Sequence, residues 1–212
     1  MPDEEDPIPA GLGRVSIACV DALGEKADYW TGLLTLDGQS VGGSYTGKYV
    51  GDVPPGAYRA EIRHPQYDTF DIMITPGTST RIRSRPRGRI VVRALDALGQ
   101  PDGCWRGVLT EDGTSLGGAY SGEAVVDVLP GAYRAEIHHP QHDVYPVTVA
   151  AGGVERWESR PRGRVIVRAI AALGEPDGCW RGVLDQAGTS LGGAYGGDAV
   201  VDVPVEIKIV VA

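Results

Sequence analysis

Short runs of alternating apolar and polar residues make up most of this chain. In Tyr133–Ile137 the first, third and fifth residues are apolar and the two between them are charged, as expected for a strand with one solvated face. Val15, Ile17 and Cys19 share one face of an earlier run, which makes Cys19 a small buried thiol. No stretch has the three-to-four-residue spacing of an amphipathic helix. The pattern therefore predicts an all-β protein.

Residues 87–161 show how the strands are expected to follow one another. We predict about seven short strands with turns every 8–12 residues, which is typical of a small antiparallel β-sandwich. Gly117-Gly118 predicts a bend in the third strand. The predicted strands are Gly88–Asp96, Cys104–Thr110, Ser115–Tyr120, Glu123–Val128, Ala132–His138, Val144–Ala150 and Val154–Ser159.

The same unit occurs two and a half times. Residues 13–86 align without gaps on residues 88–161 at an offset of 75, with 37 of 74 positions identical. A third copy matches the second at 31 of 41 positions before the pattern breaks at Pro204. We therefore expect tandem small sandwich domains rather than one fused sheet. The expected parts are an acidic N-terminal tail (1–12), repeat 1 (13–86), repeat 2 (87–161) and an incomplete repeat 3 (162–212).

The end of repeat 3 departs from the other two. Its last residues alternate again, with Val205, Ile207, Ile209 and Val211 on one face. We expect this strand to take the place of the fifth strand and to be an edge strand at an interface with another chain. The last two strands have no counterpart, which predicts an open sheet edge and an uncovered core. Two outcomes stay open: a partner or second copy completes the sheet by strand addition, or the terminal strand closes the domain by itself.

Short basic joints connect the repeats. The sequence Arg-Pro-Arg-Gly-Arg occurs at residues 85–89 and again at 160–164. We expect these arginines to be solvated or to pair with acidic residues of adjacent repeats; the alternative is a site for phosphate or an acidic partner. Because proline stiffens each joint, we predict a semi-rigid rod of domains.

One motif carries a resemblance to known families. Pro55–Tyr58 launches an alternating strand, and Pro130–Tyr133 repeats the motif. It resembles a hallmark of carboxypeptidase-regulatory-like, transthyretin-like and PEGA-type domains, although Gln66 and Gln141 stand where that group often has glycine. The resemblance implies an immunoglobulin-like or transthyretin-like sandwich. It also implies a module that serves as a spacer, an adhesive unit or an accessory domain, mostly without catalysis.

Charge and composition exclude several classes of function. A net charge of −8 argues against a general nucleic-acid binder, which needs a surplus of Lys and Arg. No apolar run approaches the roughly 18 residues of a membrane span. The acidic N-terminus lacks the pattern of a signal peptide. We expect a protein that is cytoplasmic, or that is released as part of a virion or other assembly.

The cysteines and tryptophans recur at repeat-specific places. An odd number of cysteines that are replaced from repeat to repeat is not a disulfide framework, so a reducing compartment suits the chain. Trp30, Trp105 and Trp180 are equivalent, and each precedes a glycine by two residues. An exposed tryptophan row would stack on sugar rings, but we expect these rings in the core.

One loop of repeat 2 is rich in histidine. His138, His139 and His142 lie beside Asp143, at a spacing that is able to hold a metal ion. Repeat 1 keeps only one of the three histidines, as His64. We therefore expect an exposed surface loop and no metal site.

Tyr45, Tyr120 and Tyr195 form the strongest candidate ligand surface, as an exposed strip repeated in each copy. The glycine doublets before them precede no helix, so they are not phosphate loops. No nucleophile is marked out beside a histidine, so we expect no catalytic residues and no cofactor.

These features together favour a non-enzymatic structural or adhesive repeat protein. Near-identical units present the same face several times, which raises avidity without a tight single site. We expect a subunit of a larger assembly, such as a phage virion or a surface appendage, with a protein partner or a second copy of itself. The alternatives are a carbohydrate-binding module and an accessory domain of a separate enzyme.

Overall fold

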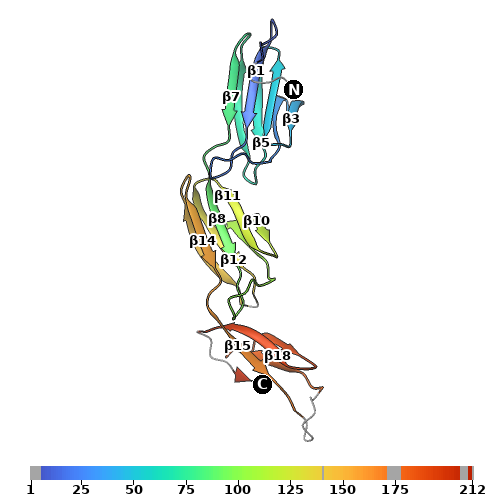
Figure 1. The fold of residues 1–212 in the computed structure, drawn as a ribbon, viewed down its shortest axis with the longest axis vertical. Coiled ribbons are helices and arrows are strands. Elements are labelled where there is room, and N and C mark those ends of the chain that lie inside the picture. Colours follow the sequence, from blue (N-terminus) through green and yellow to red (C-terminus); the bar gives the residue numbers. More distant parts are fainter. Residues whose placement is uncertain (1–5, 140, 171–177, 206–209, 212) are drawn as a thin grey trace. The chain divides into compact units, whose positions relative to one another are not determined.

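The computed structural model describes residues 6–139, 141–170, 178–205 and 210–211. These residues form nineteen β-strands and no helix (Figure 1). No helix among them is therefore long and apolar enough to cross a membrane. The all-β class predicted from the alternation is confirmed.

Repeat 1 is a sandwich of two sheets. The strand orders are β4-β1-β7 in one sheet and β3-β2-β5-β6 in the other. Its strands are β1 (Gly13–Ala18), β2 (Thr31–Thr35), β3 (Ser40–Ser44), β4 (Lys48–Val53), β5 (Gly56–Ile62), β6 (Asp68–Ile74) and β7 (Ser79–Arg83). The core is made of side chains from both sheets, among them Val15 and Ile17 of β1 and Leu33 of β2. Cys19 is buried in this core, as predicted.

One strand pair departs from the expected antiparallel pattern. β1 pairs with β4 in the antiparallel sense but with β7 in the parallel sense. Parallel pairing requires a crossover, and here the whole four-stranded sheet lies between β1 and β7 in the chain. The first and last strands of the repeat thus become neighbours.

Repeat 2 has the same seven-strand plan. Its sheets have the orders β11-β8-β14 and β10-β9-β12-β13. The strands are β8 (Gly88–Arg93), β9 (Arg106–Thr110), β10 (Ser115–Ala119), β11 (Glu123–Val128), β12 (Gly131–Ile137), β13 (Asp143–Val149) and β14 (Val154–Glu158). The register shifts between Ser115 and Gly117, which is the predicted bend. All seven predicted strands are present.

Repeat 3 has fewer strands in its described part. These are β15 (Arg162–Val167), β16 (Arg181–Leu184), β17 (Ser190–Ala194), β18 (Ala199–Pro204) and β19 (Val210–Val211). They form the sheets β15-β18 and β17-β16-β19. β19 pairs with β16 in the antiparallel sense, as β12 pairs with β9. The predicted replacement of the fifth strand therefore holds for Val210 and Val211, while Ile207 and Ile209 lie outside the described residues. Val205 was wrongly placed in this strand, because it lies in a turn directly after β18.

The first strand of repeat 3 is less covered than its counterparts. Ile90 and Val92 of β8 are fully buried, whereas the equivalent Val165 and Val167 of β15 are only partly buried. Ile166 is 59% exposed, while the equivalent Val91 is 2% exposed. Repeat 3 therefore leaves apolar surface in water that the complete repeats remove from it.

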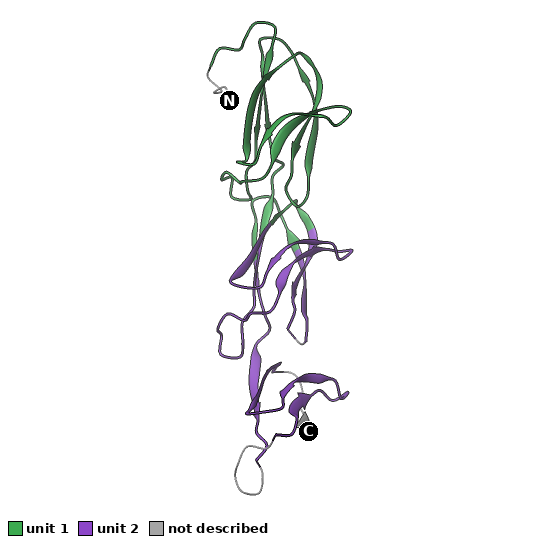
Figure 2. Ribbon diagram, turned by 90° about the vertical axis from the view of Figure 1, so that its right-hand side faces the viewer, with its two compact units in different colours: residues 1–89, 127–131, 148–155 green, residues 90–126, 132–147, 156–212 purple. Residues whose placement is uncertain are grey.

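The chain divides into two compact units (Figure 2). Unit 1 comprises residues 1–89, 127–131 and 148–155, and unit 2 comprises residues 90–126, 132–147 and 156–212. This boundary runs through repeat 2, so the division into one domain per repeat stays a prediction.

Two of the joint arginines pair with aspartates inside each unit, as predicted. In unit 1, Arg89 donates from Nε to Asp127 at 2.7 Å and from Nη2 to Asp21 at 2.7 Å. In unit 2, Arg164 repeats this arrangement, with its Nε 2.7 Å from a carboxylate oxygen of Asp202 and its Nη2 3.0 Å from Asp96. The positive charges of Arg89 and Arg164 are thus paired with carboxylates of the same unit.

Candidate functional site

The three predicted ligand tyrosines are the most exposed large side chains that recur in every repeat. Tyr45, Tyr120 and Tyr195 are 77%, 70% and 72% exposed. Each directly follows the third strand of its repeat. A glycine with φ between 64° and 69° stands two residues after each tyrosine, so the three loops share one backbone geometry. Their role as a ligand surface stays a prediction.

The prediction that the equivalent tryptophans lie in the core is wrong. Trp30 is half-buried and lies over two glycines, Gly32 and Gly43, which are cross-strand partners in β2 and β3. A Cβ atom added to Gly32 would lie 2.4 Å from the indole ring. The indole ring therefore packs directly on the backbone of the two glycines, where any side chain would collide with it. We call this pair of glycines the glycine floor. Gly32 faces away from the fully buried Leu33, because neighbouring side chains of a strand point to opposite faces.

The other side of each ring is also occupied in repeats 1 and 2. The Arg63 guanidinium lies 4.2 Å from the Trp30 ring centroid, within cation–π range. In repeat 2 the His138 ring lies 4.4 Å from Trp105, and His142 stacks on His138 at 4.4 Å. Flat stacking on a sugar needs a free ring face, so these two tryptophans do not offer one. Trp180 has the same glycine floor and is 40% exposed.

The histidine-rich loop is not wholly a surface loop as predicted. His139 and Asp143 are buried, while the exposed His138 lies against Trp105 and the exposed His142 stacks on His138. Asp143 accepts hydrogen bonds from the side chains of Arg160 and Arg162, at 2.7 and 3.1 Å. Desolvation of this carboxylate is offset by two guanidinium groups, which hold the loop against the body of the repeat.

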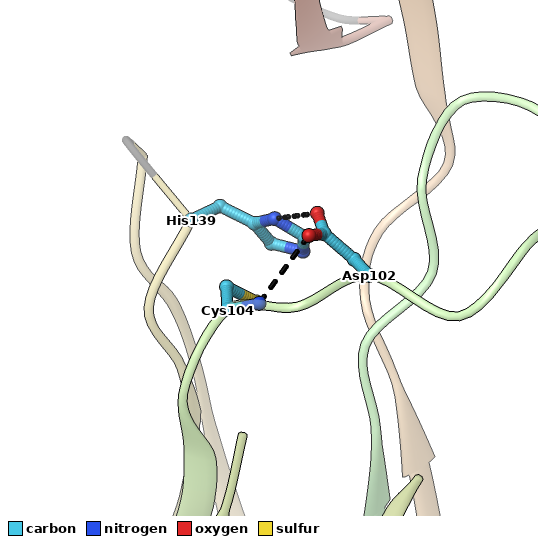
Figure 3. Close-up of side chains that lie close together, drawn as sticks. All are labelled: Asp102, Cys104 and His139. Carbon is cyan, nitrogen blue, oxygen red and sulfur yellow. Dashed lines mark hydrogen bonds and ion pairs between the residues drawn. The ribbon is translucent and has the colours of Figure 1, made fainter. Parts of the chain in front are cut away.

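The buried His139 meets two residues from a distant loop (Figure 3). Asp102 and Cys104 lie between β8 and β9, and His139 lies two residues after β12. A carboxylate oxygen of Asp102 is 3.0 Å from His139 Nδ1, and the other accepts a hydrogen bond from the Cys104 backbone N–H at 3.3 Å. One carboxylate oxygen, the Cys104 sulfur and one imidazole nitrogen all lie within 4.8 Å of one another. Sequence reasoning missed this group, because its members are far apart in the chain.

Burial controls protonation in this group. Burial, and next the positive charge of Arg162, lowers the pKa of His139. Burial also raises the pKa of the Cys104 thiol. Both groups are therefore held in their neutral forms when no cation is bound.

Repeat 1 has the same histidine in a different setting. His64 is buried, its Nε2 lies 3.1 Å from the Cys19 sulfur, and Ala27 and Tyr29 occupy the places of Asp102 and Cys104. Burial lowers the pKa of His64 to about 4 and raises that of Cys19 to about 11. At neutral pH this pair is a neutral thiol beside a neutral imidazole. It lacks the thiolate that nucleophilic catalysis by cysteine requires.

Comparisons with known proteins yield distant structural likenesses only. No protein-family model and no curated protein matches the chain. The Bacillus anthracis TIE protein is 13% identical, with 95% of this chain and 46% of that chain covered and a TM-score of 0.29. A streptococcal ancillary pilin is 14% identical, with 72% and 63% covered and a TM-score of 0.32. GBS52, a minor pilin of Streptococcus agalactiae, is 10% identical, with 69% and 94% covered and a TM-score of 0.34.

The chain thus spans about half of the first of these proteins and less than two thirds of the second. At these scores the likenesses carry no argument about function. The resemblance to carboxypeptidase-regulatory-like and related domains stays a prediction.

Proposed function

We propose that this protein is a non-enzymatic structural or adhesive subunit of a larger assembly, such as a surface appendage or a virion. In this proposal a protein partner or a second copy of the chain completes repeat 3 by adding a strand beside β15. The observation that carries it is the edge of β15 that has no partner strand among the described residues, next to a core that is only partly covered.

The complete repeats show what belongs at this edge. β1 has β4 on one side and β7 on the other, and β8 has β11 and β14. Within the described residues of repeat 3, β15 has β18 on one side and no strand on the other. An unpaired edge presents free N–H and C=O groups, which are a template for a strand from another chain.

The outer face of the β15–β18 pair fits a partner that is apolar at its centre. Ile166 is opposite Val200 in the register, and both side chains are more than half exposed. The Arg164–Asp202 pair precedes them on this face. Arg168 and Asp198, whose nitrogen and oxygen are 2.6 Å apart, lie at the other end of the strands. An apolar centre with a charged rim is typical of protein interfaces.

Light scattering across a dilution series tests the proposal on the full chain. We expect an oligomer that resists dilution, and we expect Ile166→Lys to dissociate it by placing a charge at the centre of the contact. The control Val125→Lys alters an equally exposed valine on β11, in the complete repeat 2, and should leave the oligomer intact.

A synthetic peptide separates self-association from binding of another partner. A peptide with the sequence of residues 152–160 contains β14, the strand that β15 lacks, and should bind the full chain and compete with oligomer formation. A protein that is monomeric at all concentrations and does not bind this peptide would refute strand addition.

Carbohydrate binding is a second candidate, favoured by the exposed tyrosines of the three repeats. Since both sides of Trp30 and Trp105 are occupied, a sugar would stack on the tyrosine strip. Quenching of tyrosine emission on addition of glycans, abolished by Tyr120→Ala together with its two counterparts, would support it. Unchanged glycan binding by that triple variant would exclude the strip.

A further inference from the structure

We propose that Asp102, Cys104 and His139 of repeat 2 bind one divalent transition-metal ion of the Zn²⁺ class. All three residues belong to repeat 2, and the proposal does not depend on the proposed role in an assembly. It combines carboxylate, thiol and imidazole groups, which are the three kinds of side chain that Zn²⁺ binds in proteins.

The spacing of the three groups fits a single ion. Zn²⁺ holds nitrogen and oxygen at about 2.0–2.2 Å and thiolate sulfur at about 2.3 Å, so neighbouring ligands of a tetrahedral ion lie about 3.3–3.7 Å apart. One carboxylate oxygen of Asp102, the Cys104 sulfur and one ring nitrogen of His139 lie within 4.8 Å of one another. The three side chains must therefore move closer together when an ion binds.

A buried nitrogen without a partner points to a missing ligand. His139 is 3% exposed, and its Nε2 has no hydrogen-bond partner among the described residues. A buried polar atom left unpaired costs about 1–3 kcal/mol, so such atoms call for an explanation. Ligation of a cation through Nε2 supplies this nitrogen with the partner that it lacks.

The charges of the site balance with a divalent cation. When the ion binds, the Cys104 thiol releases its proton to solvent and a metal–sulfur bond forms, so thiolate and carboxylate together supply two negative charges. Arg162, the nearby cation that lowers the pKa of His139, is already paired with Asp143 at 3.1 Å.

The site has an open side. Asp102 and His139 line a hollow of about 410 Å³ within unit 2, together with residues that include Arg164 and Leu191. Three protein ligands leave a fourth position for water or an added ligand, which is the arrangement of an exchangeable rather than a closed zinc site. The hollow gives an ion a path to that position.

The repeats provide a control within the chain. Repeat 1 keeps the histidine as His64 but has Ala27 and Tyr29 in place of the other two ligands. Repeat 3 keeps Asp177 and Cys179 in the sequence but contains no histidine. The proposal therefore predicts one ion per chain.

Cobalt binding to the full chain tests the proposal. We use protein stripped with a chelator, without a histidine tag, and with the exposed Cys179 replaced (Cys179→Ser) so that one competing thiol is absent. Addition of Co²⁺ should produce a thiolate-to-cobalt charge-transfer absorption that saturates at one equivalent and is abolished by one equivalent of Zn²⁺.

Matched variants take their residues from the neighbouring repeat, so they are compatible with the fold. Cys104→Tyr and Asp102→Ala introduce the residues of repeat 1. We expect loss of the absorption in Cys104→Tyr and at least a tenfold weaker affinity in Asp102→Ala. Cys19→Ala introduces the residue of repeat 2 and should leave the cobalt spectrum unchanged. Folded protein that shows no charge-transfer band, or a band that survives Cys104→Tyr, would overturn the proposal.

Discussion

Acidification from pH 7 to pH 5 is expected to lower the free energy of unfolding of unit 1 by about 2 kcal/mol through His64. This side chain is 1% exposed and packs against the ring of Tyr29, with ring centroids 4.6 Å apart. Its pKa is about 4 in the folded protein, because burial, and next the positive charge of Arg87, disfavours the imidazolium. In the unfolded chain a histidine has a pKa of about 6.5.

The sign follows from proton binding. Between pH 6.5 and pH 4 the unfolded chain takes up a proton at His64 that the folded protein does not, so the stability present above pH 6.5 is lost as the pH falls. The slope approaches about 1.4 kcal/mol per pH unit, and integration from pH 7 to pH 5 gives about 2 kcal/mol. The lowered pKa values of Asp21 and Asp52 act in a more acidic range, below the usual carboxylate pKa of about 4. The chosen window therefore isolates the histidine.

The measurement is a urea titration at pH 7 and at pH 5, followed by a brief deuterium pulse at one fixed pH. Peptides from β5 and β6 report the unfolding of unit 1 separately from that of unit 2. His64→Gln removes the titrating group and should reduce the difference between the two pH values by about 2 kcal/mol, whatever the variant does to absolute stability. The reasoning is refuted if wild type and variant lose the same free energy between pH 7 and pH 5.

Three further predictions concern packing, buried charge and thiol exposure. Gly107→Ala places a Cβ atom 2.5–2.7 Å from an indole ring and a carbonyl oxygen, so it should lower the free energy of unfolding by about 1–3 kcal/mol in a denaturant titration. The control Gly103→Ala places its Cβ atom in open space and should lower the free energy of unfolding far less. Asp68→Asn leaves two guanidinium groups without their buried carboxylate and should destabilise unit 1 by about 3–5 kcal/mol, and a loss below 1 kcal/mol would contradict this. In native protein a thiol reagent should label Cys179 first and Cys19 last. Cys179 is exposed, whereas Cys19 is buried and its pKa is raised to about 11. Mass spectrometry measures the order of labelling, and the reverse order would refute the burial of Cys19.

The alternation of apolar and polar residues was sufficient to predict the strands. Residues with a period of two must place alternate side chains on opposite faces, so the buried set Tyr133, Ala135 and Ile137 is readable directly. Because the repeats align at an offset of 75 residues, strands predicted in one repeat also predict the strands of the next. Pairing of the joint arginines was also predictable, because an acidic chain offers many carboxylates to each guanidinium.

Which side of a strand is covered, and by what, was decided only by the tertiary structure. The alternation places Trp30 and Gly32 on one face but does not say that this face is the outer one, where the glycines leave room for the ring. The parallel neighbour of β1 comes from the far end of its repeat, and no local pattern encodes that pairing. Asp102 and His139 lie 3.0 Å apart although the strands β9 to β12 separate them in the chain. Contacts of this kind depend on how loops meet at the end of a sandwich, whereas the period of a strand constrains only its own two faces.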